Sequence, residues 1–254
     1  MFRVVLPARY DSTRLPGKVL LPLAGKPMLQ WVWERALASR ADEVLVATDD
    51  ERIASAARAF GARVVMTAAT HASGTDRIAE VAWLQGWLPQ DIVVNLQGDE
   101  PLMPPALIDQ VRDLLETHPQ AAVGTLASPV ASLEELLDPN AVKVVTDRED
   151  RALYFSRAPI PWDRDGARGD LTTQRSFAGA RRHIGLYAYR VGALQRIAAL
   201  APSPLELRER LEQLRALENG FGIVVANAAE RPGLDVNTAA DLERVRAHLE
   251  LAGD

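Results

Sequence analysis

Short apolar runs alternate with longer helical patterns through the first half of the chain, and this alternation constrains the fold more than any other feature. Runs such as VLVAT (residues 44–48) and IVVNL (92–96) are apolar on both faces. That pattern is typical of parallel strands covered by helices on each side. The alternation therefore predicts βαβ units and an α/β fold with a doubly wound, mostly parallel sheet. The expected strands are Phe2–Leu6, Glu43–Thr48, Arg63–Met66, Asp91–Leu96 and Ala121–Leu126, and the expected helices are Pro27–Ala38, Asp50–Ala59, Asp76–Leu84 and Pro105–Thr117.

The pattern changes after about Pro139. A Pro-, Gly- and charge-rich stretch, APIPWDRDGARGDL (158–171), predicts a loop. We expect a main part of residues 1–130 and 220–254, with an inserted part of about 131–219, in one domain. The elements expected here are strands at Ala141–Thr146, Arg151–Ser156, His183–Arg190 and Ile223–Ala226, a helix at Leu205–Asn219 that begins with a capping box at Ser203, and a final helix from Thr238.

Composition excludes several classes of protein. The formal net charge of the 254 residues is −5, whereas a general nucleic-acid binder carries a basic stripe, so no nucleic-acid partner is expected. There is no cysteine, which excludes disulfides and thiolate metal sites and is compatible with a reducing cytoplasm. The N-terminus has no signal-peptide pattern and no apolar run approaches membrane-spanning length, so we expect a cytoplasmic protein with no membrane partner.

The segment Leu6–Lys18, LPARYDSTRLPGK, places three cations directly after the first strand: Arg9, Arg14 and Lys18. A strand that ends in such a loop can hold a polyphosphate through side-chain charge and backbone N–H groups. The alternative is an ordinary solvated loop. Neither G-x-x-x-x-G-K-[ST] nor G-x-G-x-x-G occurs in the chain, so a P-loop is absent and a dinucleotide-dependent oxidoreductase is disfavoured.

Three further segments carry polar residues where a ligand can bind. HASGTDR (71–77) combines small residues with a helix start, although simple capping by Thr75 or Asp76 would explain it as well. NLQGDEP (95–101) places Asp99 at the end of an apolar strand, where it can hold a hard cation or simply form a turn. Asp235, before the last helix, is either a cap or a ligand. The carboxyl ends of parallel strands are where open α/β sheets bind ligands.

Taken together, these motifs resemble the CMP-Kdo synthetase (3-deoxy-manno-octulosonate cytidylyltransferase) family. The resemblance covers nearly the whole chain in the right order. RLPGK alone is shared with other sugar nucleotidyltransferases, whereas the set HASGTDR, NLQGDEP, SRAPIPW and HIGLYAYR is far more specific. The other matching segments are LAGKPML, VATDDERI, AVKVVTD, LEQLRALENG and LDVNTAADLERV.

The resemblance implies a Rossmann-like α/β domain with a smaller dimerisation subdomain, and hence a homodimer. It implies transfer of CMP from CTP to the anomeric hydroxyl of Kdo, an acidic sugar of the lipopolysaccharide inner core, with release of pyrophosphate. Mg²⁺ is the implied cofactor, and CTP and Kdo are the implied partners. Because phosphoryl-type transfer depends mainly on positioning and charge stabilisation, we expect direct in-line displacement at the α-phosphorus.

The resemblance also assigns site residues. Arg9, Arg14 and Lys18 would hold the triphosphate, with Lys18 neutralising the leaving pyrophosphate, and Asp99 would complete the catalytic set. The cytidine side would comprise Ala8, Ser73, Arg77 and Gln97, the metal ligands would be Asp99 and Asp235, and the sugar pocket would comprise Gln97, Arg157, His183, Tyr187, Glu212 and Gln213. Without the family pattern, Tyr187 would be taken for core packing, and Arg157, His183 and Glu212 for surface residues.

The sequence departs from the family at the second metal position. The family often ends in Gly-Val-Asp-Thr-Pro-Glu-Asp-Leu, and an ungapped match places the metal aspartate on Asn237. Matching Gly-Leu-Asp to Gly-Val-Asp places it on Asp235, with Asn237 as a neutral neighbour; related CMP-sialate synthetases carry Asp-x-Asp here. Ala68-Ala69 before His71, where polar residues are common, is a smaller departure at a loop edge. Two other functions stay open: activation of a related sugar acid, of the 8-amino-Kdo or sialate type, and a non-catalytic nucleotide-binding regulator.

Overall fold

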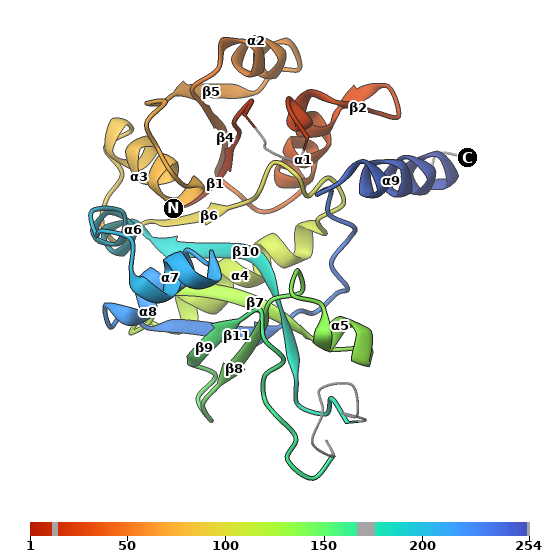
Figure 1. The fold of residues 1–254 in the computed structure, drawn as a ribbon. Coiled ribbons are helices and arrows are strands. Elements are labelled where there is room, and N and C mark those ends of the chain that lie inside the picture. The colour runs from red at the N-terminus through yellow and green to blue at the C-terminus, as the bar shows by residue number, and fades with distance from the viewer. Residues whose placement is uncertain (12–14, 167–175, 253–254) are drawn as a thin grey trace.

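The protein has a mixed α/β fold around one large sheet (Figure 1), in a computed structural model that describes residues 1–11, 15–166 and 176–252. The sheet has nine strands, and its main path runs in the order β11-β7-β10-β6-β1-β4-β5. The strands are β1 Phe2–Pro7, β4 Glu43–Thr48, β5 Arg63–Met66, β6 Ile92–Asn95, β7 Val123–Pro129, β8 Lys143–Thr146, β9 Ala152–Ser156, β10 Arg181–Arg190 and β11 Ile223–Asn227. The predicted fold class is confirmed.

The sheet is mostly parallel, with one antiparallel strand at its centre. β1 pairs in parallel with β4 and β6, β4 with β5, and β7 with β11. β10 lies between β6 and β7 and runs antiparallel to both. Its first residues also pair with β8, which forms a hairpin with β9. This hairpin lies at the opposite end of the molecule from α2 and β5 (Figure 1).

Helices cover both faces of the sheet, as the doubly apolar strands predict. In β1, Val4 and Leu6 join the core on one face and Val5 joins the core on the other. One face packs against α1 Met28–Leu37, α2 Glu51–Ala59 and α4 Pro105–Thr117, and the other against α3 Gly74–Leu84, α6 Val191–Ala198 and α8 Gln213–Glu218.

Several local expectations need correction. The cap of α3 is Ser73, whose Oγ accepts a hydrogen bond from the Asp76 backbone N–H, and not Thr75 or Asp76. The helix expected at Leu205–Asn219 is two helices, α7 Pro204–Glu209 and α8, because Arg210 adopts a left-handed conformation with φ 56°. The capping box at Ser203 is present. The structure adds a 3₁₀ turn η1 (Lys18–Leu20), the short hairpin β2 (Pro22–Leu23) and β3 (Lys26–Pro27), α5 (Leu133–Leu137) and α6.

The last helix, α9 (Ala239–Ala252), packs beside the β2–β3 hairpin (Figure 1). Leu242 and Val245 of this helix join Leu23 and Met28 in a separate apolar cluster. The chain thus returns to the region that follows the cationic loop. The division into a main and an inserted part stays a prediction; β10, within residues 131–219, belongs to the main sheet. Among the described residues, no helix combines the length and apolarity needed to cross a bilayer.

Candidate functional site

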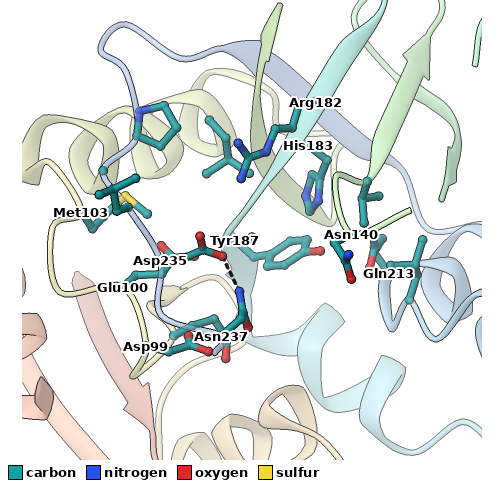
Figure 2. A pocket seen from close by; sticks show the side chains of 18 residues that line it. Asp99, Glu100, Met103, Asn140, Arg182, His183, Tyr187, Gln213, Asp235 and Asn237 are labelled. Atoms are coloured by element: carbon teal, nitrogen blue, oxygen red, sulfur yellow. Dashed lines mark hydrogen bonds between the residues drawn. The ribbon is translucent and has the colours of Figure 1, made fainter. Parts of the chain in front are cut away.

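The loops after β1, β5 and β6 meet at the carboxyl ends of the parallel strands, where the strand order reverses around β1. Two cavities lie here. The larger, of about 320 Å³, is lined by Gln97, Asp99, Tyr187 and residues of the C-terminal segment (Figure 2). The smaller is lined by residues of the first two loops, and Gln97 lines both. The sequence-predicted site residues therefore fall mainly into two adjoining compartments.

Lys18 ties the cationic loop to the acidic end of the larger cavity. Its Nζ donates to Asp99 Oδ2 at 2.6 Å and to the Val236 carbonyl at 3.0 Å. The Val236 N–H in turn donates to the Asp99 backbone carbonyl at 2.9 Å. Lys18 and Asp99, which are 81 residues apart, are thus brought into contact, and their catalytic roles stay predictions.

Three acidic side chains gather at this end of the cavity: Asp99, Glu100 and Asp235 (Figure 2). Burial, followed by the charges of Asp99 and Asp235, raises the pKa of Glu100 to about 8. Asn237 Nδ2 donates to Asp235 Oδ2 at 2.6 Å. Both candidates for the second metal position therefore line the same cavity and contact each other.

This donor set fits Mg²⁺. The ion takes one or two carboxylates together with phosphate oxygens and water rather than a cage of protein ligands alone. Asp99, Asp235 and the Asn237 side-chain oxygen supply such donors, and the Lys18 ammonium shows that a cation is held beside Asp99. Within residues 1–11, 15–166 and 176–252, no group of three His, Cys, Asp or Glu side chains is arranged to hold a metal unaided.

The segment that carries Asp235, residues 232–238, is called the C-terminal strap here. It passes so close to the loop after β6 that a Cβ on Gly233 would lie 2.3 Å from the Leu102 carbonyl oxygen and 2.4 Å from its Cβ. Only glycine fits at this position without moving backbone. The strap is therefore held at Gly233 by close packing and at Val236 by hydrogen bonds.

We expect Gly233→Ala to lower kcat about tenfold to a hundredfold, because a displacement of about 1 Å in a catalytic group can cost that much. The measurement is turnover together with the midpoint of thermal unfolding. Gly222→Ala is the matched control, since its added Cβ would meet the Gln120 carbonyl oxygen at an ordinary 3.7 Å. Equal activity in the two variants would contradict this role of Gly233.

The smaller cavity contains the predicted cytidine-side residues Ala8, Ser73 and Arg77, together with Arg9. Arg77 is 4% exposed and pairs with Asp49 at 3.0 Å. Because Ser73 accepts the capping hydrogen bond, its hydroxyl hydrogen can still be donated to a ligand. The first turn of α3 therefore presents small and polar groups to this compartment.

The wall of the larger cavity opposite the carboxylates is built from Tyr187, His183, Asn140 and Gln213 (Figure 2). Tyr187 and His183 come from β10, where a register irregularity between Ile184 and Tyr187 interrupts the pairing with β7. The rings of His183 and Tyr187 contact each other with centroids 5.2 Å apart. Among the described residues, Gln213 Nε2 is buried without a hydrogen-bond partner. It is therefore a donor that a polar ligand would satisfy.

Burial, and after it the neighbouring Arg182, lowers the pKa of His183 to about 3 from an ordinary value of 6.5. The neutral imidazole is hydrogen-bonded to the Thr125 hydroxyl at 2.9 Å. Between about pH 3 and pH 6.5, His183 is protonated in the unfolded chain and neutral in the folded chain. The contribution of the neutral His183 to the free energy of unfolding is therefore present in full above about pH 6.5. It is lost as the pH falls, by about 1.4 kcal/mol per pH unit.

We expect the stability advantage of the wild type over His183→Asn to shrink by that slope between pH 6.5 and 4.5. The measurement is the free energy of unfolding in denaturant, and parallel pH profiles of the two proteins would contradict the expectation.

Some predicted residues lie elsewhere. Arg157 lines neither cavity; its Nε donates to the Glu209 carbonyl at 2.7 Å and its Nη1 to the Pro139 carbonyl at 2.8 Å. Glu212 lines the smaller cavity and Gln213 the larger one. Arg14 lies outside the described residues. The sugar-pocket roles of Arg157 and Glu212 stay predictions.

Sequence reasoning missed three polar residues that line the larger cavity: Glu100, Asn140 and Arg182. Glu100 was visible as the second acid of NLQGDEP, and Arg182 as part of the basic run Arg181-Arg182-His183 at the start of β10. Asn140 carried no signal, because it follows Pro139 in a segment whose pattern predicts only a turn.

The cationic loop, the opposed carboxylates and the doubly wound sheet define a nucleotidyltransferase. Residues 3–228 match the family described as cytidylyltransferase. The chain is 60% identical over 244 residues to the 3-deoxy-manno-octulosonate cytidylyltransferase of Thioalkalivibrio sulfidiphilus, covering 96% of this chain and 97% of that one. It is 55% identical over 249 residues to the enzyme of the same name from Halorhodospira halophila, covering 98% and 97%. The chain belongs to the 3-deoxy-manno-octulosonate cytidylyltransferase family.

Solved structures agree. A CMP:2-keto-3-deoxy-manno-octonic acid synthetase complexed with CTP superposes with a TM-score of 0.88 at 42% identity, covering 99% of each chain. A 4-diphosphocytidyl-2C-methyl-D-erythritol synthase superposes with a TM-score of 0.63 at 15% identity, covering 98% of this chain and 99% of that one, which shows a shared fold alone. The family expected from the sequence motifs is confirmed.

Proposed function

We propose that this protein transfers CMP from CTP to the anomeric hydroxyl of 3-deoxy-manno-octulosonate (Kdo) and releases pyrophosphate, with Mg²⁺ as cofactor. The observation that carries the proposal is the convergence of Lys18, Asp99 and Asp235 at one end of a cavity whose other wall is polar and aromatic. A site of this kind, in a chain 60% identical to a 3-deoxy-manno-octulosonate cytidylyltransferase, suits a triphosphate on one side and an acidic sugar on the other.

The residues of this chain would act mainly by binding and orientation. The cytidine would lie in the smaller cavity, and the triphosphate would extend past Arg9 and Lys18 toward Asp99. Lys18 would leave its contact with Asp99 for the phosphate oxygens and would neutralise charge on the departing pyrophosphate. Gln213 and the Tyr187 hydroxyl would orient the sugar so that its anomeric oxygen faces the α-phosphorus. No covalent enzyme intermediate is needed.

Asp99 and Asp235 would hold Mg²⁺, with the side-chain oxygen of Asn237 beside them. When bound, the ion would offset phosphate charge and lower the pKa of the attacking hydroxyl. Burial, and after it the charges of Asp99 and Asp235, raise the pKa of Glu100. A cation would stabilise acidic groups that lie so close together, and this supports the arrangement.

The test is pyrophosphate release from the purified protein with CTP, Kdo and Mg²⁺, each omitted in turn. We expect release only when all three are present. Release with a sialate or an 8-amino sugar acid but not with Kdo would keep the mechanism and change the acceptor. No release with any acceptor would leave a non-catalytic nucleotide-binding role.

We also propose that the protein works as a homodimer in the cytoplasm. Large apolar side chains of the segment 131–219 are exposed, with Leu153 at 62% and Trp162 at 45%, and burial against a second copy would remove them from water. The absence of cysteine accords with a reducing compartment. Light scattering should give twice the chain mass of 27.7 kDa; a monomer at working concentration would contradict the dimer.

A further inference from the structure

A buried arginine that takes no part in the proposed chemistry joins two segments of the site. Arg215 lies on α8 with its side chain 6% exposed. Its Nε and Nη2 donate to the two carboxylate oxygens of Glu206 at 2.8 and 2.6 Å, and its Nη1 donates to Asp76 Oδ1 at 3.2 Å. One guanidinium therefore holds a carboxylate from α7 and a carboxylate from α3, which are 130 residues apart in the chain.

A second contact runs parallel to the first. Thr75 Oγ1 donates to Glu212 Oε2 at 2.8 Å. Thr75 and Asp76 are neighbours in the first turn of α3, directly after Ser73 and Gly74, which line the smaller cavity. The first turn of α3 is thus attached at two points to the segment that contains α7 and α8.

The segment that contains α7 and α8 lines both cavities through two consecutive residues. Glu212 lines the smaller cavity, whereas the next residue, Gln213, lines the larger one. Arg215 follows two residues later on the same short helix. Any shift of α8 relative to α3 would therefore move a wall of each compartment at once.

We propose that Arg215 is a positioning residue that fixes the nucleotide compartment and the sugar compartment relative to each other, through Asp76 and Glu206. The inference rests on the proposed function, because it assigns CTP and the sugar acid to the two cavities. The guanidinium suits this role, since its planar fork holds two carboxylates in defined directions while a lysine ammonium gives no such geometry. Binding sites perform poorly when supporting residues leave them even 1 Å out of place.

The test uses two variants that keep a charge opposite the most buried carboxylate. Arg215→Lys retains a cation for Glu206 but loses the fork, and Asp76→Ala removes the α3 contact while leaving the Arg215–Glu206 pair. We expect each to raise the KM for CTP and the KM for Kdo together, by about fivefold or more, with a smaller change in kcat. Since both changes break the same link between α8 and α3, the Michaelis constants of the double variant should be no higher than those of the more impaired single variant. Asp113→Ala, which breaks a surface pair with Arg40, is the matched control and should leave both constants unchanged.

The outcomes separate the inference from the proposed function. No wild-type turnover with CTP, Kdo and Mg²⁺ would overturn the proposed function and this inference with it. With normal wild-type turnover, the Michaelis constants of the Arg215→Lys and Asp76→Ala variants decide whether Arg215 has the positioning role. A fall in thermal stability with both Michaelis constants unchanged, a rise in one constant alone, or additive effects in the double variant would each overturn the positioning role.

Discussion

Replacing Asp99 with asparagine should lower CMP transfer at least about a thousandfold, equivalent to about 4 kcal/mol of transition-state stabilisation. The substitution removes one negative charge and one of the oxygens that we propose to bind Mg²⁺, in the loop after β6 beside Lys18. The fold should survive, because the Val236 N–H donates to the Asp99 backbone carbonyl, which the substitution leaves in place, and the Lys18 Nζ contact with the Val236 carbonyl does not need a charge at residue 99. The measurement is the rate of pyrophosphate release, with the thermal unfolding midpoint measured beside it.

Asp109→Asn is the control for this experiment. Asp109 lies on α4 and pairs with Arg40 at 3.2 Å, outside both cavities. Its substitution changes the same chemical group and should leave turnover within about twofold of the wild type, as expected for a surface pair. If Asp99→Asn kept activity within tenfold of this control, Asp99 would not hold the metal.

The second large effect is expected at Asp235. Asp235→Asn should lower turnover at least about a hundredfold and raise the Mg²⁺ concentration needed for half-maximal rate, because a neutral amide binds a hard cation less well than a carboxylate. Asn237→Ala should lower turnover less, by about tenfold, because the site would lose one neutral ligand oxygen and Asp235 would lose the 2.6 Å hydrogen bond from Asn237.

Which of these two variants needs more Mg²⁺ and loses more activity decides which residue occupies the second metal position. A Mg²⁺ titration of both variants at saturating CTP and Kdo gives that order directly. If Asn237→Ala needs more Mg²⁺ than Asp235→Asn and loses more activity, the ungapped match to the family is correct and Asn237 is the principal ligand. Thermal unfolding should be similar in the two variants, because both residues lie at the surface of the cavity and not in the core.

The fold was predictable where local pattern determines structure. Apolar runs such as VLVAT became β4 because strands covered on both faces have few alternatives. The prediction of one helix over Leu205–Asn219 was wrong. The helix is interrupted at Arg210, and arginine gives no local sign that it will adopt a left-handed conformation. The position of β10 between β6 and β7 could not be predicted either, since strand pairing at that sequence distance leaves no mark in a periodicity.

The site was predictable as a set of motifs but not as a geometry. LPARYDSTRLPGK and NLQGDEP indicated the cations and the carboxylate, whereas the contact between Lys18 and Asp99 was visible only in the structure. That Glu212 and Gln213 face different cavities follows from the start of α8, which the sequence did not locate. The buried Arg215 stood among charged neighbours that made a solvated helix face the ordinary expectation.

The central placement of β10 also bears on how the chain folds. β6, β1, β4 and β5 are all complete by residue 95 and can pair among themselves. β7 follows soon after but has no direct partner among them, because the strand that joins it to β6 begins only at residue 181. Until then β6 keeps an open hydrogen-bonding edge, which is a site for mispairing. The joining of the two halves of the sheet is therefore the long-range step that we expect to limit the folding rate.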